Sequence, residues 1–196
     1  DVCSSDLATT HGARSITADK ILIAVGTIPA PPPGVPADGE TIIVSDGITE
    51  LTRLPRSMAV VGAGVIGMEY ASMFSALDVN VTVVDKRERP MEFLDHEILD
   101  ELVHQMRKHH VTFRLGEAVE RLEIAEGPPR RAVIHLVSGK RLVSDLVLFS
   151  VGRLGATESL NLGAAGLLAD DRGRVKVDKQ LRTSRSEEHT SELQSP

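Results

Sequence analysis

The hydrophobic and polar positions of this chain alternate between short, wholly apolar runs and longer segments with apolar residues at helical spacing. Short apolar runs bounded by turn residues are typical of buried strands, and helical spacing is typical of helices that pack on one face. The pattern therefore predicts an α/β fold. Buried strands are predicted at 20–25, 58–61, 80–84, 111–115 and 145–151, and helices at 45–54, 65–77 and 95–109.

After Glu117 the helical spacing gives way to three short strand-like segments. Ser138-Gly139 and Gly127-Pro128-Pro129 are turn sequences between them, so we expect a three-stranded antiparallel meander. Its strands are predicted at 119–124, 132–137 and 140–143, and the glycine-rich stretch that follows ends in a short predicted strand at 174–177. Five prolines between Pro29 and Pro36 exclude a helix or a central strand there and predict a stiff exit from one domain.

A glycine-rich motif lies between a predicted strand and a predicted helix. Gly62, Gly64 and Gly67 have the spacing Gly-x-Gly-x-x-Gly, and Asp85 closes the next strand. Together these features predict a Rossmann-type dinucleotide-binding unit, in which the first glycine allows a tight turn, the second lets a pyrophosphate approach and the third lets the helix pack closely. The helix N-terminus stabilises an anion by about 0.3–1 kcal/mol.

The residues after the second strand of this unit bear on the choice between NAD and NADP. We expect Asp85 to accept hydrogen bonds from both hydroxyls of an adenosine ribose, which favours NAD(H). A 2′-phosphate about 4 Å from this carboxylate would meet a repulsion of about 4 kcal/mol. Lys86, Arg87 and Arg89 follow, and they either offset this repulsion or form a solvated loop. The motif predicts a dinucleotide and leaves NAD versus NADP open.

Composition narrows the class of protein further. Of the 196 residues 41% are hydrophobic, and this fraction excludes a disordered protein. The chain has a single cysteine, which excludes a disulfide scaffold. No apolar run approaches the roughly 20 residues that span a bilayer. With four Phe, one Tyr, no Trp and a net charge of −6, the chain is a poor candidate for binding nucleic acid. We therefore expect no nucleic-acid or membrane partner and a cytoplasmic location.

Both ends of the chain have a composition foreign to the rest. The DNA string AGATCGGAAGAGCACACGTC encodes Arg185-Ser186-Glu187-Glu188-His189-Thr190, and its reverse complement encodes Asp1-Val2-Cys3-Ser4-Ser5-Asp6. This string resembles a sequencing adapter, so we expect residues 1–7 and 185–196 to be adapter-derived artefacts. Without the charged residues of both ends, the net charge falls from −6 to −2.

Three stretches resemble the FAD/NAD(P)-dependent pyridine nucleotide-disulfide oxidoreductase family, which includes lipoamide dehydrogenase, glutathione reductase and the soluble pyridine nucleotide transhydrogenases. ILIAVGTIPAPPP is similar to the Ala-Thr-Gly-Ser-x-Pro element of the FAD domain, with Val25 and Thr27 in place of the usual Thr and Ser. GAGVIGMEYAS is similar to the fingerprint of the NAD domain. DLVLFSVGR followed by RGRVKVDKQLRTS resembles the return into the FAD domain.

The resemblance implies FAD and NAD(P) as cofactors and nicotinamide nucleotides as partners. It implies a domain order of 8–39 for the end of the first FAD half, 40–152 for the NAD(P)-binding domain and 153–184 for the start of the return, with Glu69 near the nicotinamide. It further implies a homodimer or higher oligomer formed through a C-terminal domain beyond this sequence. The implied cofactor-binding residues are Gly62, Ala63, Gly64, Val65, Ile66, Gly67, Glu69, Asp85, Lys86, Arg87, Val119, Gly152, Val25, Gly26 and Thr27.

Within the family, MEFLDHEILDEL and VIHLVSGKRLVSDLVLFSVGR are more similar to the transhydrogenase branch than to the disulfide reductases. Such an enzyme moves hydride from NADPH to NAD+ through its flavin and needs no cysteine pair. The alternatives are a disulfide reductase of the lipoamide dehydrogenase type, whose Cys-x4-Cys would precede Ala8, and a non-catalytic dinucleotide-binding redox sensor. Because the first FAD fingerprint and the dimer domain are not in the sequence, we expect this chain to be inactive alone and to bind NADH weakly.

Other polar residues carry no predicted chemistry. His96, His104, His109 and His110 do not form a close pair on one helix face with a carboxylate, so no metal site is predicted. Asp95 precedes a predicted helix and is interpreted as its N-cap. No nucleophile has a partnered base, and no catalytic residue is predicted.

Overall fold

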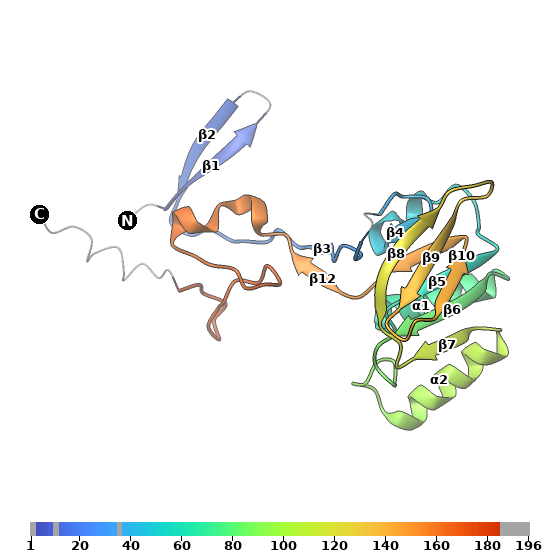
Figure 1. Ribbon diagram of the computed structural model, residues 1–196. Coiled ribbons are helices and arrows are strands. Elements are labelled where there is room, and N and C mark those ends of the chain that lie inside the picture. The colour runs from blue at the N-terminus through green and yellow to red at the C-terminus, as the bar shows by residue number, and fades with distance from the viewer. Residues whose placement is uncertain (1–2, 10–11, 35–36, 185–196) are drawn as a thin grey trace, which may run out of the picture. The chain divides into compact units, whose positions relative to one another are not determined.

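The computed structural model describes residues 3–9, 12–34 and 37–184, and the chain divides into two compact units (Figure 1). The central unit is Pro29–Arg153, and the flanking unit combines the residues up to Ile28 with those from Leu154 onward. The chain passes from one unit to the other at β3 (Thr27–Pro29) and β12 (Arg153–Gly155), which pair as a two-stranded sheet.

A five-stranded parallel sheet is the framework of the central unit. Its strands have the order β4-β11-β5-β6-β7. The chain runs from the edge strand β4 through β5 and β6 to the other edge at β7, and β11 later returns between β4 and β5. All four residues of β11 are buried, which is expected where both faces of a parallel sheet are covered. The strands are β4 (Ile42–Val44), β5 (Ser57–Val61), β6 (Asn80–Asp85), β7 (Thr112–Leu115) and β11 (Leu146–Phe149).

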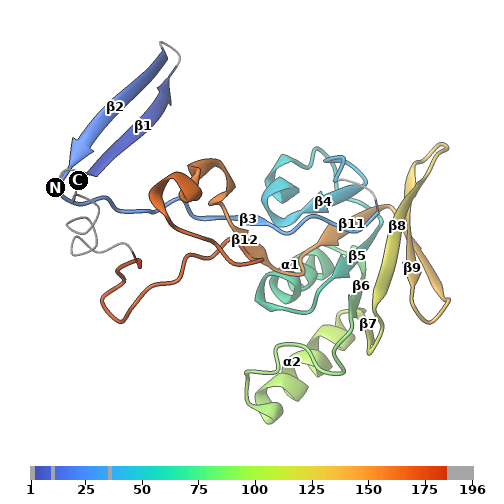
Figure 2. The same ribbon diagram turned by 60° about the vertical axis from the view of Figure 1, so that its left-hand side comes forward.

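Two different layers cover the faces of this sheet (Figure 2). The helices α1 (Val65–Ala76) and α2 (His96–Lys108) lie on one face. An antiparallel meander lies on the other, formed by β8 (Val119–Ala125), β9 (Arg131–Leu136) and β10 (Arg141–Ser144). In the described part of the chain, no helix is long and apolar enough to cross a membrane.

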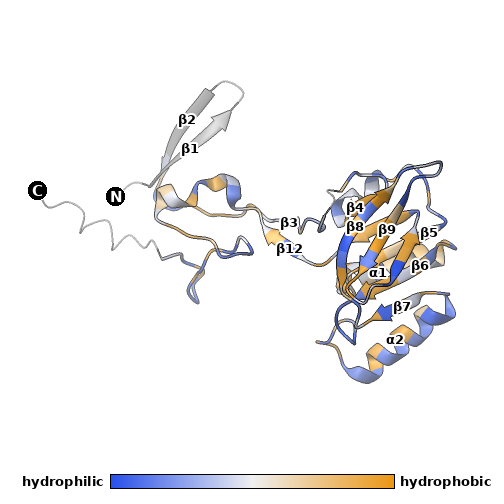
Figure 3. Cartoon of the chain, viewed as in Figure 1, coloured by the Kyte–Doolittle hydropathy of each residue, from blue (hydrophilic) through white to orange (hydrophobic). Residues whose placement is uncertain are grey.

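The alternation of side chains along β5 divides the interior into two cores. Met58 and Val60 pack toward the helices, while Ala59 and Val61 pack toward the meander. Figure 3 shows hydrophobic residues concentrated on the strands of this unit, and both hydrophobic and hydrophilic residues along α2. Helix α2 buries Leu99, Val103 and Met106, the helical spacing that predicted it.

The flanking unit has less regular structure. β1 (Cys3–Thr9) and β2 (Gly12–Ala18) form an antiparallel hairpin, and two short 3-10 helices follow β12, η2 (Glu158–Leu160) and η3 (Leu162–Ala165). Cys3–Leu7, which we expect to be adapter-derived, thus belong to a strand in the structure, and this leaves their origin untested. The predicted artefact at 185–196 lies outside the described residues.

The predicted α/β class and the antiparallel meander are confirmed, but three local predictions are wrong. The apolar run 20–25 is not a strand, because no strand of the described residues pairs with it, and Leu22 is 88% exposed. Residues 174–177 form only isolated bridges. The helix predicted at 45–54 is a 3-10 helix, η1 (Ser45–Glu50). The apolar run 20–25 would form a buried strand only if another strand paired with it and a second layer covered it.

The proline-rich stretch, predicted as a stiff exit from one domain, is hydrogen-bonded to the central unit. The carbonyl of Pro33 accepts a hydrogen bond from the Leu122 N–H at 3.3 Å, and the Ala30 N–H donates to the Gly152 carbonyl at 3.0 Å. The compact unit therefore begins at Pro29, about ten residues before the predicted boundary at 39/40. The boundary after Arg153 lies one residue beyond the predicted one. The assignment of these segments to FAD and NAD(P) domains stays a prediction.

We expect Leu148→Ala to destabilise the central unit strongly. Leu148 is fully buried between the sheet and the helices, and a buried Leu→Ala change costs about 2–5 kcal/mol in free energy of unfolding. The matched control is Leu54→Ala, since Leu54 is 57% exposed and its truncation should cost less than about 0.5 kcal/mol. Urea denaturation followed by circular dichroism measures both, and equal losses would contradict this packing.

Candidate functional site

The glycine-rich loop lies at the carboxyl end of β5, where ligands bind in open α/β sheets. The Gly62 N–H donates to the carbonyl of Val84 at 2.8 Å, which ties the loop to the end of β6. Gly62 has φ +107°, and a Cβ at this position would collide with the backbone of Ser150. The residue must therefore be glycine for both conformation and space.

Gly67 and Gly64 perform different tasks within the loop. A Cβ on Gly67 would collide with the Gly62 carbonyl and lie 2.7 Å from Ser150 Oγ, so only glycine lets α1 pack this closely on the strand. A Cβ on Gly64 would point into open space, and this residue is the N-cap of α1. The first N–H groups of α1 have no acceptor within the helix. Open space in front of a helix N-terminus fits an anionic group such as a pyrophosphate.

Ala63 joins the glycine-rich loop to the loop that follows β6, residues 86–91, which is called the basic loop below. Its N–H donates to Asp85 Oδ2 at 2.6 Å, and its carbonyl accepts a hydrogen bond from the Met91 N–H at 3.1 Å. Met91 is buried and has φ +39°, so the basic loop turns back sharply at this residue. The two loops are thus held together through both polar groups of one peptide residue.

The carboxylate of Asp85 is saturated by protein donors. Besides the Ala63 N–H, it accepts hydrogen bonds from the Arg87 N–H at 2.8 Å, from Arg87 Nε at 2.9 Å and from Arg87 Nη2 at 2.6 Å. Burial raises the pKa of Asp85, but the hydrogen bonds from Arg87 and Ala63 outweigh it and hold the pKa below its usual value. Asp85 is therefore a buried anion at neutral pH.

The hydrogen bonds from Ala63 and Arg87 restrict how the Asp85 carboxylate could bind the hydroxyls of a ribose. A carboxylate has about four acceptor positions, and the structure fills them with Ala63 and Arg87. A ribose hydroxyl would have to displace the Arg87 side chain, which is 36% exposed. Arg87 is thus no solvated loop residue, whereas Lys86 is exposed and Arg89 is 3.4 Å from Asp100 of α2.

The loop after β7 supports the basic loop from the other side. The N–H groups of Gly116 and Glu117 donate to the carbonyls of Arg87 and Asp85 at 2.9 and 3.0 Å. Val119, a predicted cofactor-binding residue, follows at the start of β8 and is half-buried. Val119 therefore lies two residues after Glu117, whose N–H is hydrogen-bonded to the Asp85 carbonyl.

Sequence reasoning missed two residues of this site, Ser150 and Met91. Ser150 follows β11, donates its N–H to the Val61 carbonyl at 2.8 Å and packs against both Gly62 and Gly67. No motif marks either residue, because their roles are backbone contacts set by the fold. Gly152, which was predicted, is exposed with φ +131° and lies at the same end of the sheet.

Glu69, Asp95 and the predicted residues at 25–27 take no part in the hydrogen bond between the glycine-rich loop and Asp85. Glu69 is exposed on α1, and Asp95 caps α2 as predicted by accepting a hydrogen bond from the Glu97 N–H at 2.9 Å. Val25, Gly26 and Thr27 belong to the end of the flanking segment and are exposed; the Gly26 carbonyl accepts the Ala156 N–H at 3.1 Å. Among the described residues, no three His, Cys, Asp or Glu side chains are grouped as metal ligands would be.

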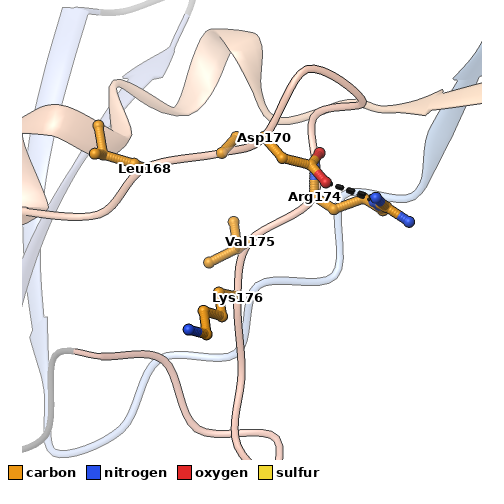
Figure 4. A pocket seen from close by; sticks show the side chains of 6 residues that line it. Leu168, Asp170, Arg174, Val175 and Lys176 are labelled. Carbon is orange, nitrogen blue, oxygen red and sulfur yellow. Dashed lines mark hydrogen bonds and ion pairs between the residues drawn. The ribbon is translucent and has the colours of Figure 1, made fainter.

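A hollow of about 580 Å³ lies in the flanking unit (Figure 4), and none of the residues that line it is a predicted site residue. It is lined by Leu168, Ala169, Val175 and Lys176, together with the ion pair between Asp170 and Arg174 at 2.7 Å. The Arg174 side chain and two backbone N–H groups lower the pKa of Asp170 to about 2. These contacts stabilise the turn that carries both residues.

The chain matches the family model described as pyridine nucleotide-disulphide oxidoreductase over residues 2–187. A soluble pyridine nucleotide transhydrogenase of Mycobacterium bovis is 47% identical over 169 residues, which cover 86% of this chain and 36% of that protein. The corresponding protein of Colwellia psychrerythraea is 42% identical over 170 residues, with shares of 87% and 36%.

Two solved structures are similar to this chain in fold. A flavoprotein disulfide reductase of Escherichia coli, RclA, in its Cu(II) complex, superposes with a TM-score of 0.82 at 31% identity, covering 92% of this chain and 40% of that one. LpdA of Mycobacterium tuberculosis has a TM-score of 0.83 at 24% identity and covers 91% of this chain and 39% of its own, which shows a shared fold.

The chain belongs to the pyridine nucleotide-disulphide oxidoreductases, a family whose members use FAD and NAD(P). It spans little more than a third of the length of the curated relatives that it matches.

We expect Gly67→Ala to cost far more stability than Gly64→Ala. The added methyl group at position 67 collides with the backbone at Gly62, whereas at position 64 it meets nothing within 4 Å. Overpacking of this kind costs about 1–3 kcal/mol or more, so the melting temperature should fall clearly only for Gly67→Ala. Equal melting temperatures for the two variants would contradict the close approach of α1 to the loop.

The turn held by Asp170 and Arg174 should respond to acid only at very low pH. Because the pKa of Asp170 is depressed to about 2, its contribution is present above the ordinary value of 3.8 and is lost as the pH falls toward 2. A carbon-13 NMR titration of the Asp170 carboxyl should show this midpoint. In Arg174→Met the midpoint should rise toward 3.8, and an unchanged midpoint would contradict the ion pair.

Proposed function

We propose that the central unit binds a nicotinamide dinucleotide, as part of a flavoprotein that transfers hydride between NADPH and NAD+. The observation that carries this proposal is the arrangement of the glycine-rich loop. Open space lies before the N-terminus of α1, and one peptide, that of Ala63, links this loop to the acid at the end of β6. A pyrophosphate and the adjoining ribose of a dinucleotide are spaced to use these two places together.

The Asp85–Arg87 ion pair supports the acceptance of both nicotinamide nucleotides. With Arg87 swung away, Asp85 offers acceptors to the ribose diol of NAD(H). With its guanidinium turned to the ligand, Arg87 offers a planar fork of donors to the 2′-phosphate of NADP(H). An enzyme that exchanges hydride between NADPH and NAD+ must accept both ligands. The names of the relatives, at 42–47% identity, support transhydrogenation as the reaction of the whole protein.

A bound flavin would supply the hydride chemistry, accepting hydride from one nicotinamide ring and returning it to another. The residues of this chain would bind and orient the nucleotide. Gly62–Gly67 would hold the pyrophosphate, Asp85, Lys86 and Arg87 the adenosine end, and Val119 the region beside the adenine. Glu69 and Gly152 would face the nicotinamide half. Val25–Thr27, in the stretch that resembles an FAD-domain element, would contact FAD.

A disulfide reductase is the second candidate, because RclA, at 31% identity, is a flavoprotein disulfide reductase. The two functions differ in whether a redox-active cysteine pair accepts electrons from the flavin. The glycine-rich loop and Asp85 do not distinguish these two functions, so the central unit supports both. A Cys-x4-Cys in the sequence preceding this segment in the source DNA would favour the reductase.

Titration calorimetry of the 196-residue chain with NADH tests nucleotide binding directly. We expect weak but measurable binding to the wild type and at least tenfold weaker binding to Gly64→Val, whose side chain fills the space before α1. Gly163→Val is the control, since a Cβ there also meets nothing within 4 Å. Equal affinities of the wild type and Gly64→Val would exclude this pyrophosphate site.

Arg87→Ala should change the preference between the two nucleotides. Loss of the guanidinium removes the donors for a 2′-phosphate and frees Asp85, so NADPH should bind about tenfold more weakly while NADH binds no worse. Arg121→Ala on the exposed face of the meander is the matched control. If Arg87→Ala weakened NADH and NADPH binding equally, the proposed role of the ion pair would be wrong.

A further inference from the structure

The order of strands in the parallel sheet indicates where each half of a bound dinucleotide would lie. The glycine-rich loop follows β5, the acid that ends β6 lies on one side of it, and β11 is the neighbour of β5 on the other side. With the adenosine over the end of β6 and the pyrophosphate at α1, the nicotinamide half must lie toward the end of β11. The residues there are Ser150–Arg153.

This strand end is fixed to the glycine-rich loop on one side. The Ser150 N–H donates to the Val61 carbonyl at 2.8 Å, and the Ser150 backbone lies where a Cβ of Gly62 would be. Two residues further on, Gly152 is exposed, with φ +131°, and its carbonyl accepts the Ala30 N–H at 3.0 Å. An exposed glycine backbone beside the phosphate loop can approach a ligand closely.

Arg153 anchors the other side of this strand end. Its Nη1 donates to Asp46 Oδ1 at 2.6 Å, its Nη2 to Asp46 Oδ2 at 3.2 Å, and Nη1 also lies 3.3 Å from Ser45 Oγ. Ser45 and Asp46 begin η1, directly after β4, which is the neighbour of β11 on the side away from the glycine-rich loop. Two parallel hydrogen bonds from one planar guanidinium fix direction as well as distance.

We propose that the Asp46–Arg153 pair is a positioning device that holds the Gly152 backbone in place for the nicotinamide half of the dinucleotide. This inference rests on the proposed function. Arg153 acts through the backbone that it anchors and is a positioning residue rather than a catalytic one. Gly152 lies between two fixed points, Ser150 against the glycine-rich loop and Arg153 against η1.

Because the Asp46–Arg153 ion pair is partly exposed, we expect it to fix the position of the backbone rather than to add much to the free energy of unfolding. The side chains of Arg153 and Asp46 are 31% and 55% exposed, and ion pairs with this exposure contribute little to global stability. A bidentate contact between a strand end and a 3-10 helix instead restricts how the segment between them can move. Lysine, which has a single ammonium group, would keep the charge without the two-point contact.

The experiment compares NADH with ADP-ribose, which has the adenosine and pyrophosphate groups and no nicotinamide. Both are titrated into the 196-residue chain as wild type, Arg153→Met, Arg153→Lys and Asp46→Asn, with melting temperatures measured in parallel. We expect Arg153→Met and Asp46→Asn to bind NADH about five- to tenfold more weakly and ADP-ribose less than about twofold more weakly, because only the nicotinamide half loses its support. Arg153→Lys should give an intermediate loss.

A double variant, Asp46→Arg with Arg153→Asp, restores a bidentate pair with reversed charges and should recover part of the NADH affinity. Arg121→Met is the control for removing an exposed arginine of the same unit. Unchanged NADH affinity in Arg153→Met, or equal loss for NADH and ADP-ribose, would overturn the positioning role while leaving the proposed function intact. A wild-type chain that binds ADP-ribose and NADH no better than Gly64→Val would instead overturn the proposed function itself.

Discussion

The hydrogen bond between the Ala63 N–H and the buried Asp85 carboxylate is the contact on which the candidate site depends. It joins the turn after β5 to the end of β6 at 2.6 Å, inside the molecule, where a charged acceptor makes a strong bond. Since the Ala63 carbonyl in turn accepts from Met91, the glycine-rich loop and the basic loop keep a single relative position. A ligand that bridges the two loops meets a surface that is already assembled, which reduces the entropy lost on binding.

The sheet provides the second constraint, because its order places three functional segments side by side. β6, β5 and β11 are neighbours, although β11 follows β6 by some sixty residues of helix, strand and meander. The close approaches at Gly62 and Gly67 then bring the end of β11 against the loop after β5. The other face of the same parallel sheet is covered by the meander, which packs a second hydrophobic core against it.

The sequence predicted the central unit well, because its signals are local. Each apolar run of the sheet is flanked by turn residues, and the spacing of Gly62, Gly64, Gly67 and Asp85 is a direct consequence of the strand–loop–helix–strand geometry. The run at 20–25 misled the prediction because apolar residues predict a strand only where they are buried, and in the structure Ile21 and Leu22 are exposed and no described strand pairs with this run. Ser150, Met91 and the Arg87 contact to Asp85 could not be predicted, since they depend on long-range packing and on one rotamer.

Binding at the glycine-rich loop is the central claim, and amide chemical shifts test it residue by residue. In a nitrogen-15 labelled 196-residue chain titrated with NADH, we expect shift changes at Ala63, Gly64, Asp85 and Gly152, with little change at Asp170 or Val175 in the flanking unit. Changes confined to the hollow around Asp170 and Val175, or no changes at NADH concentrations that saturate dinucleotide-binding proteins, would contradict the account.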